Sequence, residues 1–158
     1  MSNRFVMTRR VEFVDTDMAG IVHFTAFFRY METAEHEMFR SLGLSLAAGG
    51  QAPHVGWPRV RCGFDFVKPL RFGDEAEVHI GVARIGAASI TYEAEIVRNG
   101  EIVARGHSTS ACCEVGPGTQ MKPVPVPTEV GEKLRQHLIP EPQASVKESQ
   151  KNAGDGSR

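Results

Sequence analysis

The fold of this chain is decided by residues 24–42, FTAFFRYMETAEHEMFRSL, which have the periodicity of one long helix. The apolar residues that recur at steps of three and four are Phe27, Met31, Ala34, Met38 and Leu42. This spacing places them on one face of an α-helix. Thr25 is expected to cap the first turn, and Gly43 is a natural stop after the last one.

Period-two patterns on both sides of the helix predict a sheet. Residues 6–14 mix β-branched and aromatic residues with arginines, which is typical of a strand. After the helix, strands are expected over residues 57–67, 73–84, 87–98 and 101–114. The Asn99–Gly100 pair is a strong hairpin signal between the last two. The expected fold class is α+β, with an antiparallel sheet around a long central helix.

The sheet is expected to end at residues 122–127, KPVPVP, because alternate prolines cannot donate to a regular ladder. Residues 128–138 predict a short terminal helix. Residues 140–158 contain almost no large apolar side chains and are predicted to be disordered. The 158 residues are therefore interpreted as one domain over 1–139 followed by a tail over 140–158, and that tail is expected to be dispensable.

The composition argues against several classes of protein. The net charge is −1, so no nucleic-acid partner is predicted. No apolar run approaches the roughly 18 residues of a membrane span, and the first residues lack the apolar core of a signal peptide. A cytoplasmic location is therefore expected. The three cysteines form neither a disulfide framework nor a zinc-type spacing, so no metal and no cofactor is predicted.

The residues best suited to chemistry lie just before the helix. Asp15 and Asp17 belong to a loop over residues 15–23 that leads into the helix at Phe24. A carboxylate there can attack a carbonyl carbon or activate water, while the free N–H groups at the helix start polarise the carbonyl oxygen. Turn or capping aspartates are the alternative interpretation. From the residues by themselves, both interpretations stay open.

Residues 11–24, VEFVDTDMAGIVHF, resemble the signature of the 4-hydroxybenzoyl-CoA thioesterase family. Weaker matches follow in the same order, at residues 28–32 (FRYME), 69–74 (PLRFGD), 85–89 (IGAAS) and 122–127. Together the matches extend over residues 8–138. The resemblance implies a hotdog fold, in which a five-stranded antiparallel sheet wraps a long central helix.

The resemblance also implies roles for residues of this chain. Asp17 matches the family's catalytic carboxylate, as nucleophile or general base, and Asp15 is expected to be a turn or cap residue. The backbone N–H of Phe24 matches the group that polarises the thioester carbonyl. Many relatives have Tyr-His where this chain has His23-Phe24, so the imidazole is displaced by one position. An assisting role and a loop or interface position both remain open for His23.

Substrate contacts are expected from two other segments. Phe27, Phe28 and Met31 are expected to line an acyl tunnel, whereas Glu32 is expected to make a buried structural hydrogen bond. Residues 85–89 match the strand that flanks pantetheine, with Gly86 allowing close approach and Ser89 offering a hydrogen bond.

Some relatives hold the phosphates of CoA with basic residues beside that strand, but here only Arg84 lies close to Gly86. A thioester of an acyl-carrier protein therefore stays open as substrate. Other candidates for a phosphate patch, each also readable as a solvated strand edge, are Arg59, Arg61, Lys68, Arg71 and Arg105.

The sequence thus predicts a thioester hydrolase that acts on a small or medium acyl-CoA or acyl-carrier-protein thioester. Because family members place the site between subunits, a homodimer or homotetramer is expected. A non-catalytic acyl-thioester binding or regulatory module with the same fold is the first alternative. A hotdog hydratase or dehydratase is the second.

Overall fold

The computed structural model describes residues 3–46, 54–116, 118 and 120–140. Its elements, in chain order, are β1 (Phe5–Arg10), the 3-10 turn η1 (Phe13–Asp15), α1 (Phe24–Ser41), β2 (His54–Gly56), β3 (Arg59–Phe66), β4 (Glu75–Ile85), β5 (Ser89–Arg98), β6 (Glu101–Ala111), β7 (Cys113–Val115), β8 (Lys122–Pro123), α2 (Thr128–Leu134) and the 3-10 turn η2 (Arg135–His137). The predicted α+β class is confirmed.

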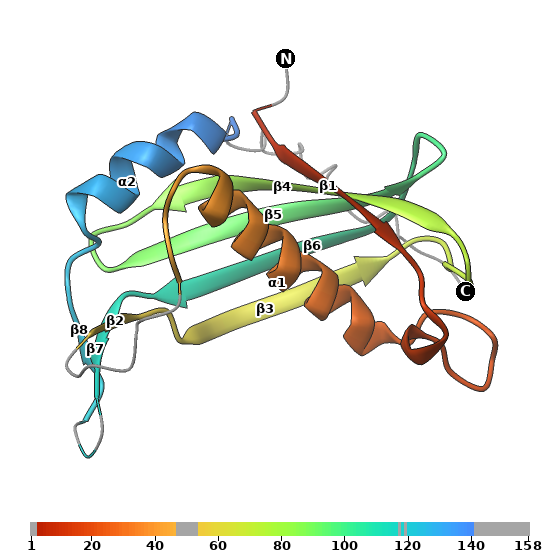
Figure 1. Ribbon diagram of the computed structural model, residues 1–158, viewed down its shortest axis with the longest axis horizontal. Coiled ribbons are helices and arrows are strands. Elements are labelled where there is room, and N and C mark those ends of the chain that lie inside the picture. Colours follow the sequence, from red (N-terminus) through yellow and green to blue (C-terminus); the bar gives the residue numbers. More distant parts are fainter. Residues whose placement is uncertain (1–2, 47–53, 117, 119, 141–158) are drawn as a thin grey trace, which may run out of the picture.

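Five antiparallel strands form the main sheet in the order β1-β4-β5-β6-β3, and α1 lies across one face of it (Figure 1). Alternate residues of β4 and β5 are buried, because strand side chains point to opposite faces in turn. The buried rows pack against α1 and form the core. One helix against a sheet of this order is the hotdog arrangement that was expected.

The helix begins and ends close to the predicted residues, although its cap differs. Gly43 has a φ of 67°, so it stops the helix as expected. The prediction that Thr25 is the N-cap was wrong. His23 is the last extended residue before α1, and its Nδ1 accepts the N–H of Thr25 at 3.4 Å. Thr25 already lies inside the first turn.

The strand predicted over 6–14 is shorter than expected. β1 ends at Arg10 and a 3-10 turn follows, because Asp15 folds back on Glu12. The Glu12 N–H donates to Asp15 Oδ2 at 3.0 Å, and Asp15 donates its own N–H to the Glu12 carbonyl. This reciprocal capping takes residues 13–15 out of the ladder.

A second, smaller sheet was missed by the sequence analysis. The strand predicted over 101–114 divides at Cys112, and β7 leaves the main sheet to pair with β2 and β8. The main sheet does end before residues 122–127, but Lys122 and Pro123 still pair with β7. Residues 47–53 and most of the tail expected over 140–158 lie outside the described residues.

Three further features of the described residues concern membrane spans, metal ligands and cysteines. No helix among them combines the length and apolar character needed to cross a membrane. In the same residues, no group of three or more His, Cys, Asp or Glu side chains is placed to hold a metal ion. Cys62 is exposed, Cys112 and Cys113 are buried, and all three are free thiols.

The C-terminal segment is fastened to the outer side of β4. The helix predicted over 128–138 corresponds to α2 and the 3-10 turn η2 that follows it. Beyond them, Ile139 is buried and donates its N–H to the Val82 carbonyl at 3.0 Å. Gly81 makes room for this contact, because a side chain there would collide with Ile139.

We expect a chain that ends at Pro140 to unfold at the same urea concentration as the full chain, within error. A chain that ends at His137 loses the buried Ile139 side chain, worth about 2 kcal/mol, and should unfold at a clearly lower concentration. Urea titrations followed by circular dichroism compare the three chains. Equal midpoints for the two truncated chains would contradict this account of the C-terminal segment.

Candidate active site

Asp17 is held in a tight turn between η1 and α1. Its N–H donates to the Ile21 carbonyl at 2.9 Å, and its carbonyl accepts the Gly20 N–H at 3.0 Å. Gly20 has a φ of 74°, a conformation that residues with a side chain rarely adopt. Asp17 Oδ1 accepts the Ala19 N–H at 2.8 Å, whereas Oδ2 has no partner among the described residues. One carboxylate oxygen is thus oriented and the other is available.

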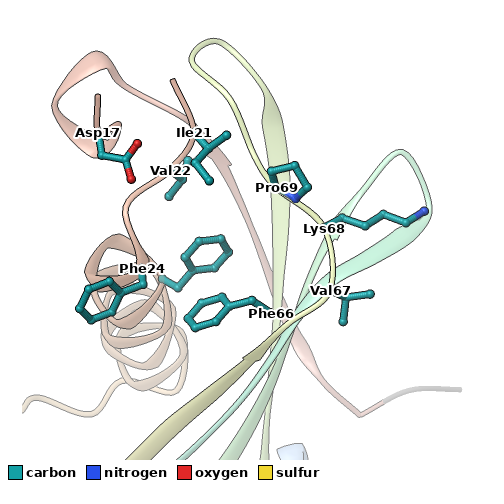
Figure 2. A pocket seen from close by; sticks show the side chains of 9 residues that line it. Asp17, Ile21, Val22, Phe24, Phe66, Val67, Lys68 and Pro69 are labelled. Atoms are coloured by element: carbon teal, nitrogen blue, oxygen red, sulfur yellow. The ribbon is translucent and has the colours of Figure 1, made fainter. Parts of the chain in front are cut away.

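A cavity of about 470 Å³ lies beside this carboxylate. Its lining is apolar apart from Asp17 and Lys68, which Figure 2 shows on opposite sides. Rings from the helix and from the edge strand form its floor, with Phe27 and Phe66 at 5.1 Å between centroids. The other lining residues are Ile21, Val22, Phe24, Val67 and Pro69. The cavity can therefore hold an apolar group against a carboxylate.

The start of α1 borders the same cavity at Phe24. The first N–H groups of a helix have no partner within the helix. Here the Thr25 N–H is taken by the His23 ring and the Ala26 N–H by the His23 carbonyl. The Phe24 N–H has no acceptor among the described residues. A hydrogen-bond donor with the positive end of the helix dipole behind it thus lies beside the cavity that Asp17 lines.

The His23 ring is engaged at the helix start. Its Nδ1 lies 2.8 Å from Thr25 Oγ1, and its ring centroid lies 4.6 Å from that of Phe24. His23 is exposed and is not among the residues that line the cavity. The histidine that is displaced by one position from the family pattern is therefore the N-cap residue of α1.

Asp15 is the buried anchor of the loop. It is 1% exposed and accepts hydrogen bonds from Tyr30 Oη at 2.7 Å and from Arg29 Nη2 at 3.0 Å, besides the one from Glu12. Arg9 Nη2 lies 3.7 Å away, and its guanidinium sits over the Tyr30 ring. Burial by itself raises the pKa of the Asp15 carboxyl, but these donors outweigh it and hold the pKa below its ordinary value.

Through this anchor, the loop and α1 are held together. The Asp15 carbonyl also accepts the His23 N–H at 2.8 Å, just before the helix. Burial, and next the bond to Asp15, raise the pKa of the Tyr30 hydroxyl, so it stays protonated as a donor. The expected cap role of Asp15 is confirmed. Its partners on α1 were missed, because nothing local in the sequence pairs positions 15 and 30.

The residues expected to line an acyl tunnel are divided between two cavities. Phe27 lines the cavity of Asp17, whereas Phe28 and Met31 line a second one of about 240 Å³. The Phe64 ring packs against both side chains, 5.9 Å from the Phe27 ring and 5.0 Å from the Phe28 ring. The residues of the expected tunnel therefore line two separate cavities rather than one.

The glutamate buried under α1 is Glu35, and the expectation of a buried bond for Glu32 was wrong, since Glu32 is exposed. Glu35 Oε2 accepts a hydrogen bond from Arg59 Nη1 at 2.7 Å. Burial raises the pKa of the Glu35 carboxyl, and Arg59 opposes this shift. The helix period explains the difference, because residue 35 rather than 32 faces the sheet.

Gly86 and Ser89 lie at the opposite end of the sheet from Asp17 (Figure 1). They belong to the turn between β4 and β5. This turn lies about 33 Å from the start of β4, because a strand rises ~3.3 Å per residue. The Gly86 N–H donates to the Ser89 carbonyl at 2.8 Å, and a Cβ at Gly86 would lie 2.9 Å from Ser89 Oγ. Within one chain, the structure does not bring them to the Asp17 cavity.

Comparison with known proteins points to one family. A family model described as the Thioesterase-like superfamily matches residues 11–134. A 1,4-dihydroxy-2-naphthoyl-CoA hydrolase of Synechococcus sp. (strain CC9902) is 34% identical over 103 residues, covering 62% of this chain and 69% of the relative. The acyl-CoA thioesterase YbgC of Haemophilus influenzae is 25% identical over 130 residues, covering 82% and 93%.

Solved structures agree with these sequence matches. A 1,4-dihydroxy-2-naphthoyl-CoA thioesterase from Synechocystis superposes with a TM-score of 0.76 at 25% identity. The superposition covers 84% of this chain and 96% of that protein. The family match over residues 11–134 includes α1, the loop that carries Asp17 and the strands β3, β4, β5 and β6 of the main sheet.

We expect Tyr30→Phe to lower the free energy of unfolding by about 1.5–3 kcal/mol, because a buried carboxylate loses a hydrogen-bond donor. Tyr92→Phe is a matched control, since the Tyr92 hydroxyl is buried without a partner among the described residues. Its removal should leave stability unchanged or raise it. Urea unfolding of both variants measures the difference, and equal losses would refute the anchoring role of the Asp15–Tyr30 bond.

Proposed function

The chain belongs to the thioesterase-like superfamily and is a thioester hydrolase, and we propose that it cleaves acyl-CoA at the cavity beside Asp17. One juxtaposition carries the proposal. An available carboxylate oxygen and the first N–H of α1, which has no acceptor among the described residues, lie beside one apolar cavity. Thioester hydrolysis needs a base or nucleophile, a donor for the oxyanion and room for the acyl group, and this site offers all three.

In the general-base form of the reaction, water attacks the thioester and Asp17 acts as the base. The thioester oxygen accepts the Phe24 N–H, and the helix dipole stabilises the charge that develops on it. Asp17 takes a proton from a water molecule while the water oxygen attacks the carbonyl carbon. The C–S bond breaks, the proton passes to the departing thiolate, and the free acid and CoA leave. In the alternative form, Asp17 attacks directly and water cleaves the mixed anhydride.

We infer that the acyl group is small and has a flat aromatic face. The rings of Phe24, Phe27 and Phe66 border the cavity, and aromatic groups pack favourably against such rings. The division of the expected tunnel residues between two cavities limits how far an acyl group can extend along the helix. Two relatives are named for a bicyclic aromatic acyl-CoA, which agrees with this choice.

We further propose a homodimer that forms through the edge strand β3. On its outer side β3 has no partner strand among the described residues, and exposed sheet edges favour pairing. Val60, Phe66 and Val67 are 63%, 50% and 55% exposed along or just after this edge. Phe66 and Val67 also line the Asp17 cavity, so a partner on β3 would shield the site from water.

This dimer would also give Gly86 and Ser89 a place near the site. If β3 pairs antiparallel with its own copy across a two-fold axis, the partner's sheet runs in the opposite direction. The end of the sheet with the partner's β4–β5 turn then lies at the same end as Asp17. The expected pantetheine contacts would therefore come from the second subunit.

We expect Asp17→Asn to lower kcat for the best acyl-CoA by at least about 100-fold, the size of a general acid–base contribution, with little change in KM. Release of free thiol from aromatic and short-chain acyl-CoAs measures this. Glu77→Gln is the control, because it likewise converts an exposed carboxylate to an amide, but on β4 beside the opposite edge strand β1. If the wild type binds acyl-CoA without cleaving it, the non-catalytic binding module is the better description.

Val60→Lys should convert the dimer into monomers, because each copy would then have a charge on the paired edge where an exposed apolar side chain now lies. Analytical ultracentrifugation measures the mass, and the Val6→Lys variant on the opposite edge strand β1 is the control. A wild-type monomer, or a dimer that survives Val60→Lys, would place the interface elsewhere.

A further inference from the structure

A second hollow opens beside the Asp17 cavity and shares Lys68 and Pro69 with it. Its volume is about 210 Å³, and its lining includes Arg71, Arg98 and Asn99. Lys68 extends away from Asp17 on the far side of the first cavity (Figure 2). A ligand that leaves the Asp17 cavity past Lys68 would therefore meet this hollow next.

Two segments distant in the sequence build this hollow. One is the stretch after β3 that contains Lys68 and Arg71, and the other is the β5–β6 hairpin. Asn99 and Gly100 both have positive φ, so the hairpin turns tightly and sets Arg98 opposite Glu101. Arg98 is then positioned by Asp74, whose Oδ1 lies 2.9 Å from Arg98 Nη2.

The hollow has more cations than anions around it. Lys68 Nζ lies 2.8 Å from Glu101 Oε2, and Asp74 is shared by the Arg98 guanidinium and the Arg71 backbone N–H. Among the described residues, the Arg71 guanidinium bonds only to the Gly20 carbonyl, at 3.3 Å. Three basic side chains therefore face two carboxylates. The hydrogen bond and charge of Lys68, together with Arg98, lower the pKa of Glu101, which agrees with a positive surrounding.

We propose that Lys68, Arg71 and Arg98 form a subsite for the phosphate groups of the CoA nucleotide. This inference rests on the proposed function, because it places the leaving group of the same reaction. Arginine binds phosphate oxygens through paired N–H donors, and the Asn99 amide adds a neutral donor. A phosphate ester would draw Lys68 away from Glu101 and supply the anion that Arg71 lacks.

The basic residues of this subsite do not belong to the β4–β5 turn. Some relatives have basic residues beside the strand that matches Gly86, but here that turn has only Arg84 near it. Here the basic residues lie instead at the exit of the Asp17 cavity, on the same subunit as the carboxylate. A recessed hollow suits a phosphate ester on a flexible arm. The surface of an acyl-carrier protein would instead need a broad exposed basic face.

The test compares two thioesters with the same acyl group, one of CoA and one of pantetheine, which lacks the nucleotide. The measured quantity is the ratio of kcat/KM for the CoA ester to kcat/KM for the pantetheine ester. Arg98→Gln should lower this ratio about 10-fold. Arg40→Gln is the matched control, because Arg40 is also an ion-paired arginine but lies at the far end of α1.

Glu101→Gln tests the same subsite in the opposite direction. It removes the carboxylate that competes with phosphate for Lys68, so the ratio should rise about 3-fold or more. Because the two variants act in opposite directions, a general loss of folding cannot reproduce both results. Ratios equal to that of the wild type in both variants would overturn the subsite.

Direct binding separates failure of the subsite from failure of the proposed function. Adenosine 3′,5′-bisphosphate, which carries nucleotide phosphates but no thioester, is titrated into the wild type and Arg98→Gln by calorimetry. Binding that Arg98→Gln weakens about 10-fold supports the subsite even if no acyl-CoA is cleaved. Equal affinities overturn it even if acyl-CoA is cleaved. Preferred cleavage of an acyl-carrier-protein thioester that alone responds to Arg98→Gln would also overturn it.

Discussion

The buried carboxylate of Asp15 is the interaction on which the rest of the site depends. A charge that is 1% exposed survives only with hydrogen bonds on its oxygens, and here they come from the chain before the loop and from α1. Tyr30 and Arg29 contribute from the helix, and Glu12 from the strand side. Asp15 thus ties β1, the loop and α1 into one unit, and Asp17 stands two residues beyond this tie. The hydrogen bonds of Asp15 offset the entropy lost when an exposed loop is ordered, and Asp15 itself does not line the cavity.

The elements that were predicted well are those whose signal is local. The apolar spacing from Phe27 to Leu42 and the Asn99–Gly100 pair each act within a few residues, so the helix and the β5–β6 hairpin could be read directly. β1 was read too long because its end depends on Asp15, whose partners are Glu12 and the distant Tyr30. The Thr25 cap failed for a similar reason, since the turn made by Asp17 and Gly20 delivers His23 to the capping position.

The candidate site shows the same division between local and long-range information. Asp17, Phe24 and Phe27 line one cavity because they lie within a short stretch around the start of α1. Phe28 lines a different cavity from Phe27, and the packing of Phe64 from β3 against both rings cannot be read from either segment. Gly86 and Ser89 are remote because β4 is long, so a match to a family motif located them in sequence but not in space.

The site stands where the fold leaves polar groups without partners. The first N–H groups of a helix have no partner within it, and Phe24, whose N–H has no acceptor among the described residues, lines the same cavity as Asp17. The outer edge of β3, up to Phe66, likewise has no partner strand in the part of the chain that the structure describes. A substrate carbonyl can accept the Phe24 N–H, and a second subunit can pair with the outer edge of β3. Binding and assembly would therefore complete hydrogen bonds that the described residues do not make by themselves. The chemistry and the quaternary structure are therefore expected to depend on the same end of the sheet.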